Sequence, residues 1–176
     1  MSAKESWDAL AVGVYVGYLG RMFGGTSMPI TRFTMFSIAL ATSVRLGIVQ
    51  NLSVMSSIST LNLVMFLSYW TITLVLEDPF YTDATRPHVL DDVIVHAFIP
   101  LDLFFHAAFV KRAYTQTSFV PLLTYFAIYS PLFLLTRPYP FVSSGERAVI
   151  TLTLTLTLAL IVHLVSRITT KCVLNR

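Results

Sequence analysis

The chain has 176 residues, of which 55% are hydrophobic and only 12% are charged. Its mean hydropathy is +0.72, whereas a soluble domain carries about 25% charged residues. A single cysteine and a formal net charge of +3 exclude a disulfide scaffold and a nucleic-acid partner, because the latter needs clustered lysine and arginine. We therefore expect a polytopic membrane protein.

Six apolar runs follow one another along the chain, separated by short polar or Gly/Pro-containing segments. A helix that crosses a membrane needs about 20 mostly apolar residues. The runs predict helices over about 7–23, 30–50, 56–76, 89–110, 119–136 and 147–168. No connecting segment is long enough to separate domains. We predict one all-α transmembrane domain over residues 1–176, with both termini on the same side of the membrane.

One stretch has the wrong periodicity for a helix. From Thr151 to Leu158, threonine and leucine alternate, which is the pattern of a strand. A lone strand cannot satisfy its backbone groups in lipid, and the other runs do not alternate as a membrane barrel requires. We predict a helix here, whose threonine hydroxyls bond to their own preceding turn or to neighbouring helices.

Basic residues distinguish the two sides of the predicted bundle only slightly. Six crossings place seven of them on the side of the termini: Lys4, Arg45, Lys111, Arg112, Arg167, Lys171 and Arg176. The other side has five: Arg21, Arg32, Arg86, Arg137 and Arg147. Since positive loops stay inside, we expect the termini in the cytosol or the mitochondrial matrix. The sequence does not distinguish a mitochondrial inner membrane from an endoplasmic reticulum or plasma membrane.

The run 89–110 is unusual because it carries several ionisable residues, which are costly within a membrane and indicate function. At 100° per residue, Asp92, His96 and His106 share one stripe, and Asp102 precedes His106 by four positions. A carboxylate placed in this way could orient an imidazole, which can then transfer a proton near neutral pH. Asp92, Asp102 and His106 are therefore supporting candidates, and His96 is the candidate base.

Two other interpretations of these histidines remain open. Both side chains could simply form hydrogen bonds between helices. A metal site is less consistent with the sequence, because His96 and His106 are ten positions apart rather than three or four. We predict no metal and no cofactor.

The residues alone do not identify a nucleophile. Cys172 lies near the C-terminus, where no base is evident. Thr34 lies about one turn into the second predicted helix, near the face through which the 89–110 helix also enters. Thr34 and His96 are therefore expected at similar depth.

Several short motifs resemble those of the androgen-induced family of membrane proteins and its bacterial relatives, in the same order. Gly24-Gly25 followed by Thr31-Arg32-Phe33-Thr34-Met35-Phe36 is similar to that family's Gly-Gly and Lys/Arg-Phe-x-Thr entry. Leu90-Asp91-Asp92 with His96 and Pro100 is similar to its Leu-Asp-Asn…His…Pro helix. Tyr129-Ser130-Pro131 and Pro138-Tyr139-Pro140-Phe141 resemble its later Tyr-Pro segments. The matches cover roughly residues 20–165.

The family consists of six-helix threonine hydrolases of fatty-acid esters, so the resemblance implies that Thr34 is the nucleophile and His96 its general base. The chain departs from the family pattern in two places. The residues before His96 read Asp92-Val93-Ile94-Val95, where the family often has a second His and an Asn, and the connection between the second and third helices is shorter. Proteins of one fold can lose activity and persist as scaffolds.

Two functional hypotheses follow from the sequence. The first is a membrane hydrolase of fatty-acid esters, whose partners are membrane lipids. The second is a non-catalytic accessory subunit of a large membrane complex, such as a mitochondrial respiratory or ATP synthase assembly, whose partners are other membrane subunits. A transporter is less consistent with the sequence, since no internal repeat is evident.

Overall fold

The computed structural model describes residues 3–25, 33–75, 93–116, 118–136 and 144–175. Within these ranges the chain is all-helical, with six α-helices and no strand, which confirms the predicted all-α class. The α-helices are α1 (Ala3–Gly25), α2 (Phe33–Arg45), α3 (Leu52–Val75), α5 (Ile99–Phe105), α6 (Val120–Thr136) and α7 (Gly145–Leu174). Two π-helical segments, η2 (Ile94–Phe98) and η3 (His106–Val110), flank α5, and a short 3-10 turn, η4 (Ala113–Gln116), follows.

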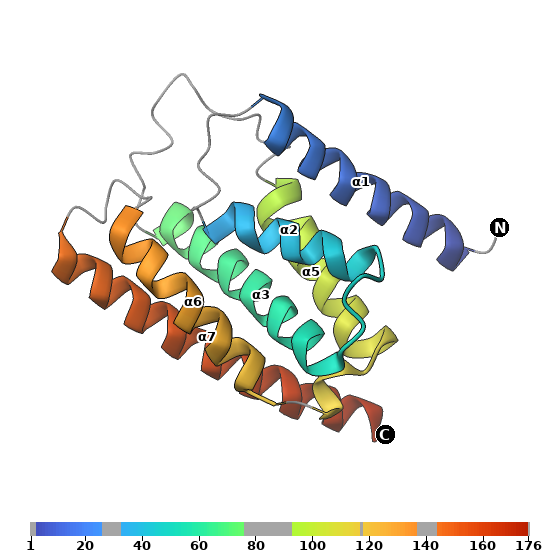
Figure 1. Cartoon of the computed structure of the whole chain (residues 1–176). Coiled ribbons are helices and arrows are strands. Elements are labelled where there is room, and N and C mark those ends of the chain that lie inside the picture. The colour runs from blue at the N-terminus through green and yellow to red at the C-terminus, as the bar shows by residue number, and fades with distance from the viewer. Residues whose placement is uncertain (1–2, 26–32, 76–92, 117, 137–143, 176) are drawn as a thin grey trace.

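The helices run up and down beside one another, with α3 at the centre of the bundle (Figure 1). It packs against α2, α5, α6 and α7, whereas α1 packs on the outside against α2. The α2–α3 turn, the end of η3, the start of α6 and the end of α7 lie together, and we call this the turn end. The start of α1 lies on this side as well (Figure 1). Helices α2 and η2 begin at the opposite end, where α3 finishes.

Helix α2 ends at Arg45, five residues before the predicted boundary at residue 50. Gly47 follows with φ +73°, a left-handed conformation that glycine adopts without strain. The amide of Gly47 donates to the Val44 carbonyl, and that of Ile48 to the Ser43 carbonyl, which is a Schellman ending. Asn51 Oδ1 then accepts from the amides of Ser53 and Val54 and caps α3. The predicted helix was too long because the apolar run extends beyond Arg45, whereas the helix is ended by the conformation of a single residue, Gly47.

Helix α7 includes the whole threonine–leucine stretch, so the predicted helix is confirmed there. Hydroxyls of Thr153, Thr155 and Thr157 donate to the carbonyls four residues earlier, at 2.7–2.9 Å. These bonds satisfy the hydroxyls within the helix, as one of the two predicted arrangements required. Ser144 accepts from the Arg147 amide and caps the helix start.

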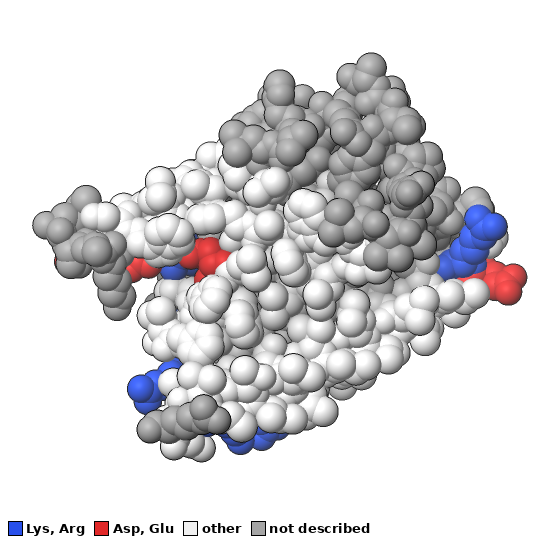
Figure 2. Space-filling model, turned by 180° about the vertical axis from the view of Figure 1, so that it is seen from behind, with Lys and Arg blue, Asp and Glu red and all other residues white. Residues whose placement is uncertain are grey.

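Apolar and polar residues are distributed in an unusual way over the bundle. Large apolar side chains are exposed, including Leu135 at 83% and Ile128 at 69%. Small polar side chains are buried along α3, namely Ser56, Ser57, Ser59, Thr60 and Asn62. On the face seen in Figure 2, the charged side chains lie towards the two ends of the described surface, and the area between them is uncharged.

Two of the described helices are long and apolar enough to cross a membrane. They cover Leu52–Thr71, with mean hydropathy 1.4, and Gly145–Leu174, with mean hydropathy 2.3. The apolar helices Phe36–Arg45, Ile94–Val110 and Val120–Thr136 are shorter. The six predicted crossings are therefore not all evident in the described residues, partly because α2 and η2 border segments outside the description.

Candidate functional site

A buried guanidinium connects three helices near the turn end. Arg45, the last residue of α2, has a side chain that is only 3% exposed. Its Nε lies 3.2 Å from Asp102 Oδ2 on α5, and its Nη2 lies 3.3 Å from Asp8 Oδ1 on α1. Its Nη1 lies 2.6 Å from His106 Nδ1. Arg45 is thus paired with acids inside the bundle.

Asp102 is the second centre of this network, with a side chain that is 5% exposed. Its Oδ1 accepts from Trp7 Nε1 at 3.1 Å, and its Oδ2 accepts from the Tyr15 hydroxyl at 3.2 Å. The same Tyr15 hydroxyl lies 2.8 Å from the Ile99 carbonyl. Both donors come from α1, so the buried carboxylate attaches that outer helix to the bundle.

The sequence predicted that Asp102 would orient the His106 imidazole directly. The structure brings both residues to Arg45 instead, so that the guanidinium contacts the carboxylate and the imidazole at once. The π-helical segment η2, which contains His96, precedes α5 and changes the angular spacing between His96 and His106 on which the predicted helical stripe depended. Since guanidinium is always a donor, His106 Nδ1 acts as the acceptor in this contact.

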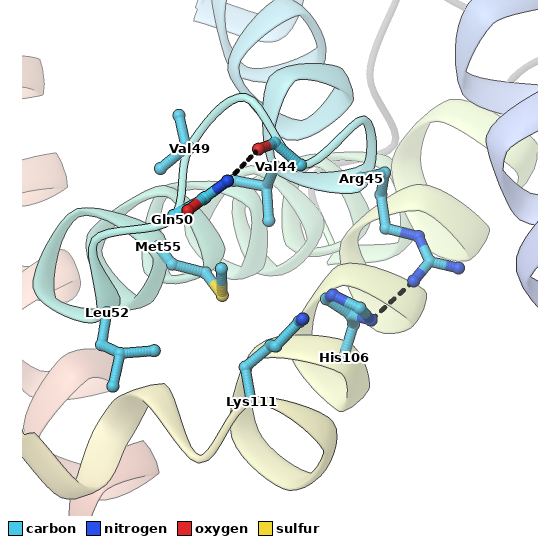
Figure 3. Close-up of a pocket in the computed structure, with 9 residues that line it drawn as sticks. Val44, Arg45, Val49, Gln50, Leu52, Met55, His106 and Lys111 are labelled. Atoms are coloured by element: carbon cyan, nitrogen blue, oxygen red, sulfur yellow. Dashed lines mark hydrogen bonds between the residues drawn. The ribbon is translucent and has the colours of Figure 1, made fainter.

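A cavity of about 290 Å³ lies beside this network, between the α2–α3 turn and η3. Its polar lining comes from Arg45, Gln50, His106 and Lys111, and Figure 3 shows the Lys111 side chain pointing into the space beside Met55 and His106. The remaining lining residues are Val44, Gly47, Val49, Leu52 and Met55. This arrangement places cationic and amide donors over an apolar floor.

The predicted base, His96, lies at the opposite end, in the π-helical segment η2. Its ring stacks on Tyr69 of α3, with centroids 3.6 Å apart and planes 2° from parallel. Trp70 Nε1 donates to the His96 backbone carbonyl at 3.0 Å. This carbonyl lies in the π-helical segment, whose backbone hydrogen bonds join residues five apart instead of four. The orientation of the His96 ring is therefore fixed by α3.

The predicted nucleophile, Thr34, lies in the first turn of α2, and its side chain is outside the described residues. Its backbone depth follows from Asn62, whose Nδ2 donates to the Ser37 carbonyl at 3.2 Å. From that level, Thr34 lies about 4.5 Å and Tyr69 about 10 Å further towards the same end of the bundle. Thr34 and the Tyr69 ring that stacks on His96 therefore lie towards the same end of the bundle, at levels that differ by about 6 Å. Asp92 lies outside the described residues.

A second threonine–histidine pair was not recognised from the sequence. Thr60 Oγ1 lies 2.9 Å from His163 Nδ1 and 3.2 Å from the Tyr114 hydroxyl, which donates to Ser59 at 3.0 Å. All four side chains are buried, and burial raises the pKa of Tyr114, so its hydroxyl stays protonated. The signal was available, since His163 is an ionisable residue within an apolar run.

The hydrogen-bond directions make this second pair a link between helices rather than a catalytic dyad. The Thr60 hydroxyl has one proton, and its geometry assigns that proton to the Ser56 carbonyl at 2.9 Å. With this assignment, His163 takes the tautomer in which Nδ1 is protonated and donates to Thr60. In this arrangement His163 cannot accept the Thr60 proton, and the pair joins α3 to α7.

The described part of the chain contains no group of three or more His, Cys, Asp or Glu side chains placed to hold a metal ion. The site is thus defined by a buried charge network within an all-α bundle and by an ordered histidine at the other end. No known family model matches the chain, and neither does any curated protein or solved structure. The function must therefore be argued from these side chains.

Proposed function

We propose that the chain is a polytopic membrane protein in which the bundle is surrounded by lipid. Its exposed apolar exterior and its buried serine, threonine and asparagine side chains support this placement, because lipid reverses the usual preference for a polar surface. Only 17% of the apolar window in α7 is buried inside the molecule, so most of that helix must contact another apolar medium. The turn end, which carries Arg45, Lys111 and Arg112, would face the cytosol or matrix.

Within this bundle we propose hydrolysis of fatty-acid esters, with Thr34 as nucleophile and His96 as general base. The observation that carries the proposal is the fixed His96 ring, stacked on Tyr69 at the end of the bundle where α2 begins, with Thr34 in its first turn. Ordered bases of this kind activate hydroxyl nucleophiles. The resemblance of the motifs around both residues to the androgen-induced family supports the same assignment.

The reaction would proceed in two steps. His96 accepts the Thr34 hydroxyl proton while the oxygen attacks the ester carbonyl carbon, and the alcohol leaves with the proton from His96. Water then attacks the acyl-threonine, gives one proton to His96, and releases the fatty acid as Thr34 regains its proton. The substrate would enter sideways from the bilayer, since its acyl chain is already there.

We expect a fluorophosphonate reagent, which reacts with activated serine and threonine hydroxyls, to label the wild-type chain in detergent or membranes. Thr34→Val should abolish labelling, because valine has the shape of threonine without its hydroxyl. Thr60→Val is the matched control, since it also removes a hydroxyl near a histidine, and it should retain labelling. In-gel fluorescence measures all three proteins. Unchanged labelling of Thr34→Val would eliminate Thr34 as the nucleophile.

A second candidate function, an accessory subunit of a larger membrane complex, is favoured by one feature of α1. Gly13, Gly17 and Gly20 have no atom within 4 Å of where a Cβ would stand, so another helix could approach α1 closely. In such a subunit the buried network would hold α1 against the bundle while α1 contacts the neighbouring chain. The absence of labelling in the wild-type chain as well would favour this function.

A further inference from the structure

The cavity at the turn end contains donors that the protein itself does not use. The Arg45 guanidinium has five N–H groups. Its Nη1 contacts His106 and its Nη2 contacts Asp8, whereas its Nε lies 3.2 Å from Asp102 Oδ2 without a hydrogen bond. One N–H group therefore remains on Nη1 and one on Nη2. Because the side chain is 3% exposed, these groups are not freely hydrated, and the cavity is the space beside them.

Lys111 is a second cation at this cavity, and it forms no ion pair among the described residues. Arg45 contacts two carboxylates, Asp102 and Asp8, whereas no described carboxylate lies within ion-pair distance of Lys111. Lys111 is an exposed residue whose side chain lines the cavity and points into it, as Figure 3 shows. A cation directed into a partly enclosed space is stabilised by an anion placed there.

The other lining residues indicate what is attached to the anion. Val49, Leu52 and Met55 form the apolar side of the cavity. A volume of about 290 Å³ is at the lower limit for ligand pockets, so it accommodates a head group and the first carbons of a chain rather than a whole lipid. Its position at the turn end, where the charged residues lie, corresponds to the level of lipid head groups.

We propose that this cavity binds the phosphate group of an anionic membrane lipid, with Lys111 and the free N–H groups of Arg45 as donors. Gln50 Nε2 and the His106 ring provide further polar contacts from opposite walls. Basic pockets between membrane helices on the cytosolic or matrix side recognise such head groups. The inference rests on the proposed membrane placement but not on the proposed hydrolysis.

The test measures the apparent affinity of the purified full chain for a short-chain phosphatidylglycerol, with phosphatidylcholine and inorganic phosphate as separate arms. Binding is followed by the rise in the thermal unfolding midpoint, because a ligand that prefers the folded state stabilises it. We expect phosphatidylglycerol to stabilise the chain more than phosphatidylcholine. Lys111→Gln should weaken this binding about tenfold, as loss of one charged hydrogen bond does.

Arg112→Gln is the matched control, because Arg112 is adjacent to Lys111 and equally classed as exposed but does not line the cavity. It should change the affinity by no more than about twofold, as expected for an exposed charge that does not contact the ligand. Equal weakening by both variants would overturn the proposal, since it would show general attraction to the positive end. Equal stabilisation by phosphatidylcholine would overturn it as well.

The remaining arms separate the sources of the anion and the two proposals. Stabilisation by inorganic phosphate to the same extent would assign the cavity to a free phosphate and overturn the lipid assignment. If the chain integrates into bilayers without preferring phosphatidylglycerol, only this inference fails. If it does not integrate into bilayers, the membrane placement fails too.

Discussion

Arg45→Met is expected to lower the free energy of unfolding by about 3–5 kcal/mol, the range for removing one partner of a buried ion pair. The substitution keeps much of the side-chain volume but leaves the Asp102 carboxylate, which is 5% exposed, without its guanidinium. Asp8 contributes less, because its side chain is 46% exposed. Denaturation by sodium dodecyl sulfate, followed by tryptophan fluorescence, measures the change.

Two further variants make this result specific. Arg112→Met removes an exposed cation near the same end and should change stability by less than about 0.5 kcal/mol. Combining Arg45→Met with Asp102→Leu should recover most of the loss, since a buried pair replaced by apolar residues is often neutral. Equal stability of Arg45→Met and Arg112→Met would show that the buried network does not hold α1, α2 and α5 together.

His96→Phe is expected to reduce ester hydrolysis by at least about 10³-fold while leaving the fold intact. Removal of a general base typically lowers turnover 10²–10⁴-fold, and removal of the base of a nucleophile more. Phenylalanine keeps an aromatic ring for the stack on Tyr69, whose centroid lies 3.6 Å from that of His96. Turnover of a fatty-acid ester in detergent, and the unfolding midpoint, are the two measurements.

The control for this substitution is His163→Phe, which removes a histidine that also neighbours a threonine. Its Nδ1 donates to Thr60, so this variant should lose some stability, about 1–3 kcal/mol for an unsatisfied buried group, but retain the intrinsic turnover of its folded fraction. The opposite result, near-native turnover in His96→Phe and loss in His163→Phe, would move the chemistry to the second pair.

The helical class was predictable from the sequence because long apolar runs leave few alternatives in lipid. The end of α2 was not, since Gly47 lies inside an apolar run and only its left-handed conformation reveals the break. The threonine–leucine stretch was predicted correctly despite its strand-like period. The reason is physical, because the backbone of an isolated strand cannot be satisfied within a membrane.

The candidate site was predictable only in part. Ionisable residues in an apolar run identified Asp102 and His106 as unusual, but not their shared contact with Arg45, which lies 57 and 61 positions away. Such contacts depend on how helices pack rather than on spacing along one helix. The roles of Thr34 and Asp92 stay predictions, because the Thr34 side chain and all of Asp92 lie outside the described residues.

The membrane-embedded bundle is tested most directly by the sidedness of two cysteines in sealed vesicles. The native chain has a single cysteine, Cys172, which is exposed near the end of α7. A Cys172→Ser, Gly145→Cys variant carries its cysteine at the other end of this helix, about 40 Å away for 27 residues of α-helix. With a membrane-impermeant maleimide, we expect the two cysteines to react from opposite sides. Reaction of both from the same side, in vesicles shown to be sealed, would contradict the membrane-spanning bundle.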